Sequence, residues 1–139
     1  MKKMVFTSLV LLSGCITMSG GPFVDVKSGL PYATLSGDEQ SSDIKLWIGS
    51  VDGKFSRKSI FNEDMFAGDF IYLAPGEHVV DAYCNYLALN KYNRTNLKFT
   101  LVANEKYKIS CSAGLGDDQA FYKITDSKNA DVPFQVLPQ

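Results

Sequence analysis

From residue 32 to the end of the chain, short hydrophobic runs alternate with clusters of turn-forming residues. Within Asp43–Val51, the residues Ile44, Leu46 and Ile48 occupy every second position, which is typical of a strand with one buried face. No segment has the hydrophobic spacing of about 3.6 residues that marks a convincing amphipathic helix. We predict further strands at residues 32–36, 54–61, 70–73, 78–86, 97–102, 107–111, 121–125 and 132–137.

Turn residues separate these runs. Asp52-Gly53 predicts a two-residue hairpin, because both central positions of a type I′ turn need a positive φ. Ala74-Pro75-Gly76 predicts a sharp corner, and the polar stretches 90–96 and 114–119 are interpreted as loops. The pattern therefore predicts an all-β fold, a small antiparallel β-sandwich of about seven to nine short strands.

Composition narrows the class of protein. The chain has 139 residues, of which 45% are hydrophobic and 21% charged, so it is long enough for one globular domain and too short for two ordinary ones. Fourteen basic residues nearly balance fifteen acidic ones. A nucleic-acid-binding domain would usually carry a basic excess, so we expect no nucleic-acid partner.

The first 14 residues differ from the rest of the chain. Lys2 and Lys3 precede an uncharged, mostly apolar stretch at residues 4–12, which is too short to span a membrane but has the length of a signal-peptide core. The following Leu12-Ser13-Gly14-Cys15 resembles the lipobox of bacterial lipoproteins. That resemblance implies cleavage before Cys15 and anchoring through two or three acyl chains on it. The alternative is an ordinary signal peptide that contains a cysteine.

The chain divides into three parts on this interpretation. Residues 1–14 are a lipoprotein signal peptide, residues 15–31 a lipid-anchored flexible tether containing glycine, proline and serine, and residues 32–139 the β-sandwich. Ile16 stands where an aspartate would favour retention in the inner membrane of enteric-type bacteria. By that analogy, the resemblance places the protein in the outer membrane, facing the periplasm.

Two segments carry a second resemblance. Val51-Asp52-Gly53-Lys54 and the run Leu73–Val80 (LAPGEHVV) resemble the hairpin and the corner of PEGA-type domains, which are small prealbumin-like β-sandwiches of envelope and surface proteins. Residues 55–70 depart from that pattern. The family shares no catalytic activity, so the resemblance implies a fold and a location.

The chemistry-bearing residues form no recognisable catalytic group. His78 is the only histidine, and no serine or cysteine stands in a nucleophile motif, so we interpret His78 as capping the Pro-Gly corner through a backbone carbonyl. No cysteine or histidine has zinc-ligand spacing, and the acidic groups near residues 38–43 and 117–118 match no calcium loop. We therefore expect no catalytic residue, no metal and no cofactor.

Two cysteines remain once Cys15 is assigned to lipid. Cys84 and Cys111 form no C-x-x-C motif, and in an exported protein they are most simply a disulfide. The alternative is a pair of reactive thiols.

Aromatic residues are dense, and most of them are expected to pack in the core: Tyr83, Tyr86, Tyr92, Tyr107, Phe121 and Tyr122. Trp47 differs because it alternates with Ile44, Leu46 and Ile48. If those three residues face inward, Trp47 and Lys45 face outward together and form a candidate binding face. The alternative is that the tether or residues 62–68 cover Trp47.

These features favour a non-enzymatic, lipid-anchored envelope lipoprotein that serves as a binding or structural accessory module. Its expected partners are membrane lipid through Cys15 and an envelope protein or cell-wall component. The alternative is a periplasmic inhibitor or immunity lipoprotein, for example against lysozyme-type enzymes. An enzyme is a third hypothesis, which would require a carboxylate and a hydroxyl beside His78 in a cleft.

Overall fold

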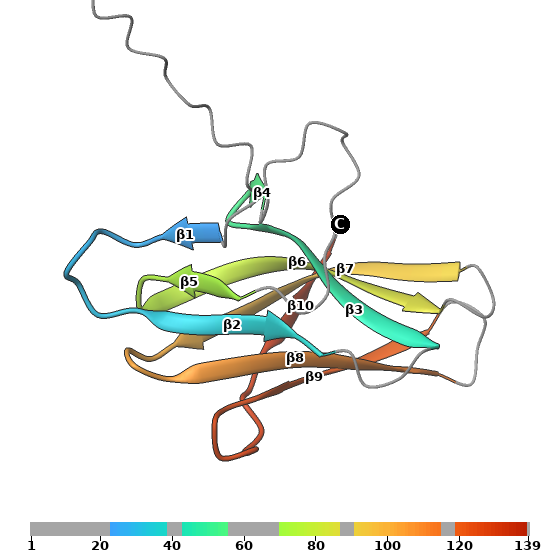
Figure 1. The fold of residues 1–139 in the computed structure, drawn as a ribbon. Helices are drawn as coiled ribbons and strands as arrows, with labels where there is room; N and C mark the ends of the chain where they lie inside the picture. The colour runs from blue at the N-terminus through green and yellow to red at the C-terminus, as the bar shows by residue number, and fades with distance from the viewer. Residues whose placement is uncertain (1–22, 39–42, 56–69, 87–90, 115–118, 139) are drawn as a thin grey trace, which may run out of the picture.

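The computed structural model describes residues 23–38, 43–55, 70–86, 91–114 and 119–138. Within these residues the chain is all-β, as the alternating pattern predicts (Figure 1). The strands are β1 (Phe23–Asp25), β2 (Ala33–Gly37), β3 (Ile44–Val51), β4 (Lys54–Phe55), β5 (Ile71–Leu73), β6 (Gly76–Tyr86), β7 (Lys91–Leu101), β8 (Lys106–Ala113), β9 (Ala120–Thr125) and β10 (Gln135–Leu137).

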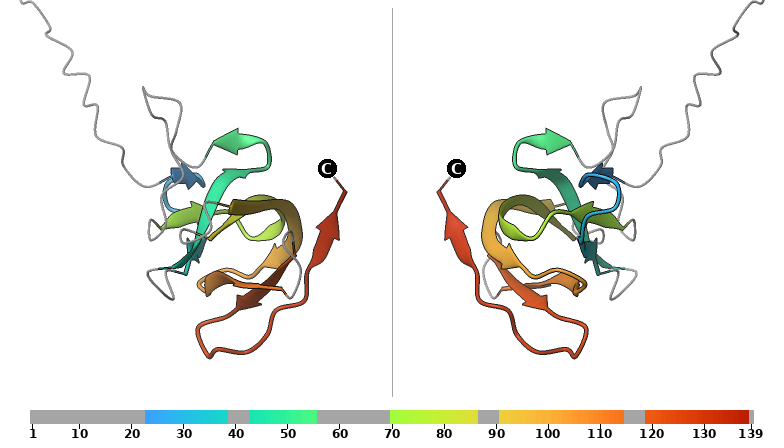
Figure 2. Two further views of the ribbon diagram at one scale, coloured as in Figure 1. Left: turned by 90° about the vertical axis from the view of Figure 1, so that its right-hand side faces the viewer. Right: turned by 90° about the vertical axis from the view of Figure 1, so that its left-hand side faces the viewer.

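Two five-stranded sheets pack face to face (Figures 1 and 2). The first sheet has the order β1-β5-β2-β8-β9, and the second has the order β10-β7-β6-β3-β4. All pairings in the second sheet are antiparallel, whereas β1 with β5 and β2 with β8 run parallel. The predicted β-sandwich is therefore confirmed. The sequence pattern did not predict the two parallel pairs.

The core lies between the sheets. Alternate residues of the long strands are buried there, as the burial pattern of β3 and β6 shows. The largest fully buried side chains are Leu35, Leu46, Leu73, Leu97, Leu101, Ile109 and Ile124. The Cys84–Cys111 disulfide crosses this core from β6 to β8, with its Cα atoms 6.0 Å apart, so the predicted bridge is confirmed and joins the two sheets.

The turn predictions are confirmed at the β3–β4 hairpin. Asp52 has a φ of 50° and Gly53 a φ of 76°, which are the positive values that a type I′ turn requires. The strand predicted at 54–61 is described only over β4, and residues 62–68 lie outside the described residues.

Two predicted segments differ from the structure. Residues 23–25, predicted as part of the tether at 15–31, form β1, whose backbone pairs with β5, so the folded domain begins before residue 32. Residues 91–96, predicted as a loop, belong to β7. Their polarity is misleading because the inward-facing Asn93 is bonded inside the domain: the Tyr122 hydroxyl lies 2.8 Å from its Oδ1.

The chain crosses between the sheets near its end. After β9 it loops out and returns to place β10 beside β7 in the second sheet (Figure 2). Within the described residues, no helix has the length and apolarity that crossing a membrane requires.

Candidate functional site

The outward side of β3 carries the two residues that the sequence singles out. Leu46 and Ile48 are buried, and Lys45 and Trp47, each one position before them, are partly exposed. The predicted alternation is therefore confirmed: Lys45 and Trp47 lie on the opposite side of the strand from the core.

Strand pairing brings further side chains beside them. Trp47 is directly opposite Tyr83 on β6, and Tyr83 is directly opposite Arg94 on β7. Directly opposite residues of antiparallel strands have their side chains on the same face. We call the resulting surface the aromatic face, and it consists of Lys45, Trp47, Asp81, Tyr83, Asn85, Tyr92 and Arg94.

The aromatic face is held together by close contacts. The rings of Tyr83 and Tyr92 have centroids 6.1 Å apart, and the Arg94 guanidinium carbon lies 4.9 Å from the centroid of Tyr83. Arg94 also donates two hydrogen bonds to Asp81, from Nε at 3.0 Å and from Nη2 at 2.8 Å. This bidentate geometry fixes the guanidinium plane over the tyrosine ring.

Asp81 is the buried anchor of this arrangement. It is only 6% exposed although it points away from the core, because Arg94 and its neighbours cover it. The hydrogen bond to Asp81 raises the pKa of Arg94, and burial together with the Asp81 charge raises the pKa of Tyr83. The charges of Asp81 and Arg94 therefore compensate each other within the face.

A glycine makes room for the Tyr83 ring. Gly49 lies at an irregularity in the β3–β6 register, between Ile48 and Ser50. A Cβ atom at this position would lie 2.6 Å from Cε2 of Tyr83 and 3.1 Å from Oδ2 of Asp81. The absence of a side chain at Gly49 thus lets the ring and the carboxylate pack against the β3 backbone.

The outward face of the first sheet has a different character. The inner strands β2 and β8 present the small polar and basic side chains Thr34, Ser36, Lys108 and Ser110 on this face. Tyr72 of β5 lies opposite Thr34, and the edge strand β9 adds Lys123 and the exposed Phe121. Such a composition is typical of a solvated sheet face. Trp47, Tyr83, Tyr92 and Arg94 are therefore gathered on only one of the two sheets.

The expectation that most aromatic residues pack in the core is half right. Tyr86 and Tyr107 are buried and Tyr122 packs against the core, whereas Tyr92 is 69% and Phe121 61% exposed. The sequence pattern did not indicate that Asp81, Tyr83, Tyr92 and Arg94 lie on the same side of the sheet as Trp47. A signal existed for β6, where Asp81, Tyr83 and Asn85 alternate with Val80, Ala82 and Cys84.

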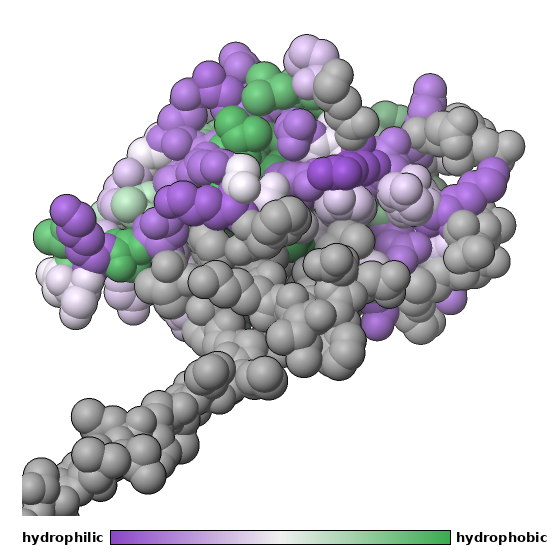
Figure 3. All heavy atoms as spheres, turned by 90° about the horizontal axis from the view of Figure 1, so that it is seen from above, coloured by the Kyte–Doolittle hydropathy of each residue, from purple (hydrophilic) through white to green (hydrophobic). Residues whose placement is uncertain are grey.

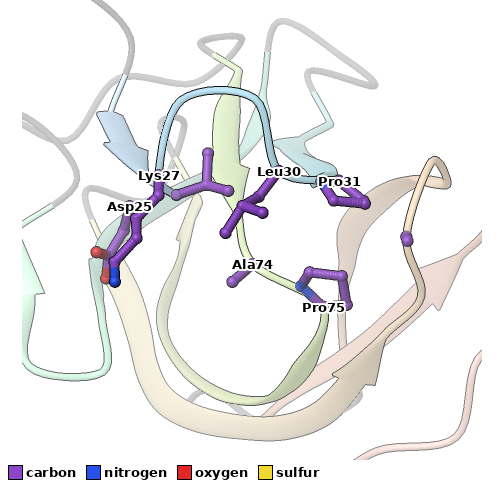
Figure 4. A pocket seen from close by; sticks show the side chains of 8 residues that line it. Asp25, Lys27, Leu30, Pro31, Ala74 and Pro75 are labelled. Atoms are coloured by element: carbon purple, nitrogen blue, oxygen red, sulfur yellow. The ribbon is translucent and has the colours of Figure 1, made fainter.

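An apolar groove at one end of the sandwich is a second candidate. The groove has a volume of about 620 Å³. Figure 4 shows Leu30 and Pro31 on one side of it, Ala74 and Pro75 on another, and Asp25 and Lys27 at its rim. Lys54 forms an ion pair with Asp25 at 2.7 Å, which raises the pKa of Lys54. The charged residues among those that line the groove are Asp25, which pairs with Lys54, and Lys27.

On the face seen from above, most of the described side chains are hydrophilic, and the hydrophobic ones form small separate groups (Figure 3). Single exposed apolar residues are normal on soluble domains.

His78 has the structural role that its position next to the corner predicts. Its Nε2 lies 2.7 Å from the carbonyl oxygen of Ala74, and its Nδ1 lies 2.6 Å from Oδ2 of Asp52. Both partners are acceptors, so a ring that donates from both nitrogens satisfies them. The carboxylate beside His78 is that of Asp52 in the β3–β4 turn. Both ring nitrogens of His78 therefore bond to groups in turns.

The remaining candidates from the sequence are the lipidation residue Cys15 and the two acidic groups. Cys15 lies outside the described residues, as do residues 39–42 and 117–118 of the two acidic groups. Among the described residues, no three histidine, cysteine, aspartate or glutamate side chains gather in a way that could hold a metal ion.

Comparisons of the chain with protein-family models, with curated proteins and with solved structures found no match.

Proposed function

We propose that this protein is a non-enzymatic, lipid-anchored lipoprotein of the bacterial cell envelope, which binds an envelope partner through its aromatic face. The anchor is Cys15, and its support is the Leu12-Ser13-Gly14-Cys15 sequence behind a basic and then apolar leader. Acyl chains on Cys15 hold the domain at the outer membrane, on the periplasmic side.

The observation that carries the binding function is the row of Trp47, Tyr83 and Arg94 across three adjacent strands. Tryptophan, tyrosine and arginine are the residue types that contribute most to binding energy at interfaces. They are placed together on one sheet, and the other sheet presents small polar and basic side chains at its middle. Binding rather than structure explains why large rings remain outside the core.

The geometry of His78 supports a non-catalytic role. Catalysis by a histidine requires a ring nitrogen that can exchange a proton with a substrate or nucleophile. In this protein, Nε2 is bonded to Ala74 and Nδ1 to Asp52, and both bonds hold turns together.

Anchoring is tested by labelling cells with a radioactive fatty acid and separating their membranes. We expect wild-type protein to carry the label and to sediment with the outer membrane, and Cys15→Ser to do neither. The matched control is the double variant Cys84→Ser/Cys111→Ser, which removes the other cysteines and should keep the label. Label retained in Cys15→Ser, or an unmodified N-terminus in the wild type by mass spectrometry, would overturn the anchor.

Binding is tested by placing a photo-reactive amino acid in intact cells at Lys45, on the aromatic face, or at Lys108, on the opposite sheet. We expect adducts with an envelope component from position 45, and we expect Tyr92→Ala to reduce them. Position 108 is the matched control, because it replaces an exposed lysine of another strand. Equal adducts from both positions would overturn the assignment of the binding face.

A further inference from the structure

We propose that the ligand of the aromatic face is a glycan, a chain of uncharged pyranose sugars such as the sugar backbone of a cell wall. This inference rests on the proposed function of that face as a binding surface and adds the chemical class of its ligand. It is carried by the shape, the side-chain composition and the charge of the face.

The rings form a platform of suitable length across the sheet, in which the planes of Tyr83 and Tyr92 are tilted by 38°. Trp47, Tyr83 and Tyr92 come from β3, β6 and β7, which are neighbours in the second sheet. Neighbouring strands lie about 4.8 Å apart, so the platform extends for about 10 Å across the sheet. An extended oligosaccharide can lie along such a row, with successive sugars over Trp47, over the Arg94 guanidinium that covers Tyr83, and over Tyr92.

The chemistry of the rings matches one face of a sugar. A pyranose presents C–H groups on its flat faces, and these groups pack on the electron-rich face of an aromatic ring. The Arg94 guanidinium, stacked on Tyr83 at 4.9 Å, adds a further flat surface to this row.

The polar residues of the face match the sugar hydroxyls. The Asn85 amide has both donors and acceptors, and Arg94 carries planar N–H donors in a position that its two hydrogen bonds to Asp81 fix. The seven residues of the aromatic face include no aliphatic side chain. Protein interfaces are also enriched in tryptophan, tyrosine and arginine, so the oligosaccharide titration is what separates a glycan from a protein partner.

The charge of the face favours an uncharged ligand. Asp81 and Arg94 compensate each other at 2.8 Å, and Lys45 is the remaining charge among the seven residues. The same contacts hold the Tyr83 ring in place before binding, which lowers the entropy lost when a ligand is ordered on it.

The experiment uses the intrinsic fluorescence of Trp47, the only tryptophan of the chain. Full-length protein in detergent is titrated with chitohexaose, a six-residue oligomer of N-acetylglucosamine, and with cellohexaose and maltohexaose. We expect a saturable change in the emission of Trp47 with at least one of these oligosaccharides.

Two tyrosine variants make the test specific. Tyr92→Ala removes an exposed ring of the platform, and we expect at least a tenfold loss of affinity. Tyr32→Ala removes a partly exposed ring that packs against Tyr72 near the other sheet, and we expect no change. Circular dichroism of both variants checks that they are folded.

The outcomes separate this inference from the function on which it rests. No saturable change with any of the three oligosaccharides, or the same affinity for Tyr92→Ala and Tyr32→Ala, would overturn the glycan assignment. If position 45 then still gives a Tyr92-dependent adduct with a protein in cells, the binding face stands with a protein as its partner. If that adduct is also absent, the binding function is overturned as well.

Discussion

Asp52 and His78 are 26 residues apart in the chain, yet Oδ2 of Asp52 lies 2.6 Å from Nδ1 of His78. The other oxygen of Asp52 accepts a hydrogen bond from the backbone N–H of Val79 at 2.9 Å. His78 in turn reaches the carbonyl oxygen of Ala74 in the Pro-Gly corner. These contacts lock the β3–β4 hairpin turn against the Pro-Gly corner.

The first prediction concerns this lock. Asp52→Ala removes the acceptor of Val79 and His78, and it places alanine at a φ of 50°, where a side chain without a local hydrogen bond is strained. We expect the free energy of unfolding to fall by about 1–3 kcal/mol, measured by urea denaturation.

Asp52→Asn is the matched control for the lock. Asparagine tolerates positive φ and is favoured in type I′ turns, and its side-chain oxygen can still accept from Val79. We expect it to lose less than half as much stability as Asp52→Ala. If both variants lose the same stability, the positive φ at residue 52 and the hydrogen bond to Val79 do not contribute to the stability that Asp52 provides.

The second prediction concerns the disulfide between the sheets. Cys84 and Cys111 are separated by 27 residues, and closing a loop of that size is worth about 3.5 kcal/mol in the chain-entropy model. We expect reduction to lower the melting temperature by about 10 °C, measured by calorimetry with and without a reductant. The double variant Cys84→Ala/Cys111→Ala should melt near the temperature of the reduced protein and should not respond to reductant. A melting temperature unchanged by reduction would contradict this prediction.

The third prediction concerns alkaline pH. Burial raises the pKa of Tyr122, whose hydroxyl contacts Asn93, and burial also raises the pKa of Tyr86. A tyrosine whose pKa is higher in the folded than in the unfolded protein stabilises the fold fully below the unfolded value of about 10. That stabilisation is lost as the pH rises from there toward the folded value.

Urea denaturation at pH 8 and pH 11 tests this dependence. We expect the free energy of unfolding to be lower at pH 11, and Tyr122→Phe to reduce the difference by about 1 kcal/mol. Tyr32→Phe, at a partly exposed ring, should leave the difference as it is in the wild type. A pH difference of the same size in Tyr122→Phe would show that Tyr122 does not carry the effect.

Local chemistry explains which elements could be predicted from the sequence. The Asp52-Gly53 hairpin, the corner at Pro75 and the alternation in β3 depend on neighbouring residues, and all three are found in the structure. The start of β7 could not be predicted in the same way. Its inward-facing Asn93 is stabilised by Tyr122, which is 29 residues away.

Long-range pairing explains what the sequence left open at the candidate site. Alternation placed Lys45 and Trp47 together, because both lie on one strand. Which residues stand beside Trp47 depends on the register of β6 with β3 and with β7, and that register brings Tyr83 and Arg94 into the row. The parallel pairing of β2 with β8 is likewise set by packing between distant segments.

The last prediction tests how the aromatic face is supported. Gly49→Ala adds a methyl group that would lie 2.6 Å from Cε2 of Tyr83, so the ring has to move away from the β3 backbone. We expect a loss of about 1–3 kcal/mol in the free energy of unfolding, as for other overpacked sites. We also expect a changed emission of Trp47, which lies opposite Tyr83.

A double-variant cycle isolates the cause. If the methyl group acts by displacing the ring, Gly49→Ala should cost less than half as much in a Tyr83→Ala background, because the ring is already absent. Its contact with Oδ2 of Asp81, at 3.1 Å, accounts for the part of the cost that remains. If Gly49→Ala lowers the free energy of unfolding equally in both backgrounds, the β3 backbone itself requires a glycine at this position. The position of Tyr83 on the aromatic face would then not depend on Gly49.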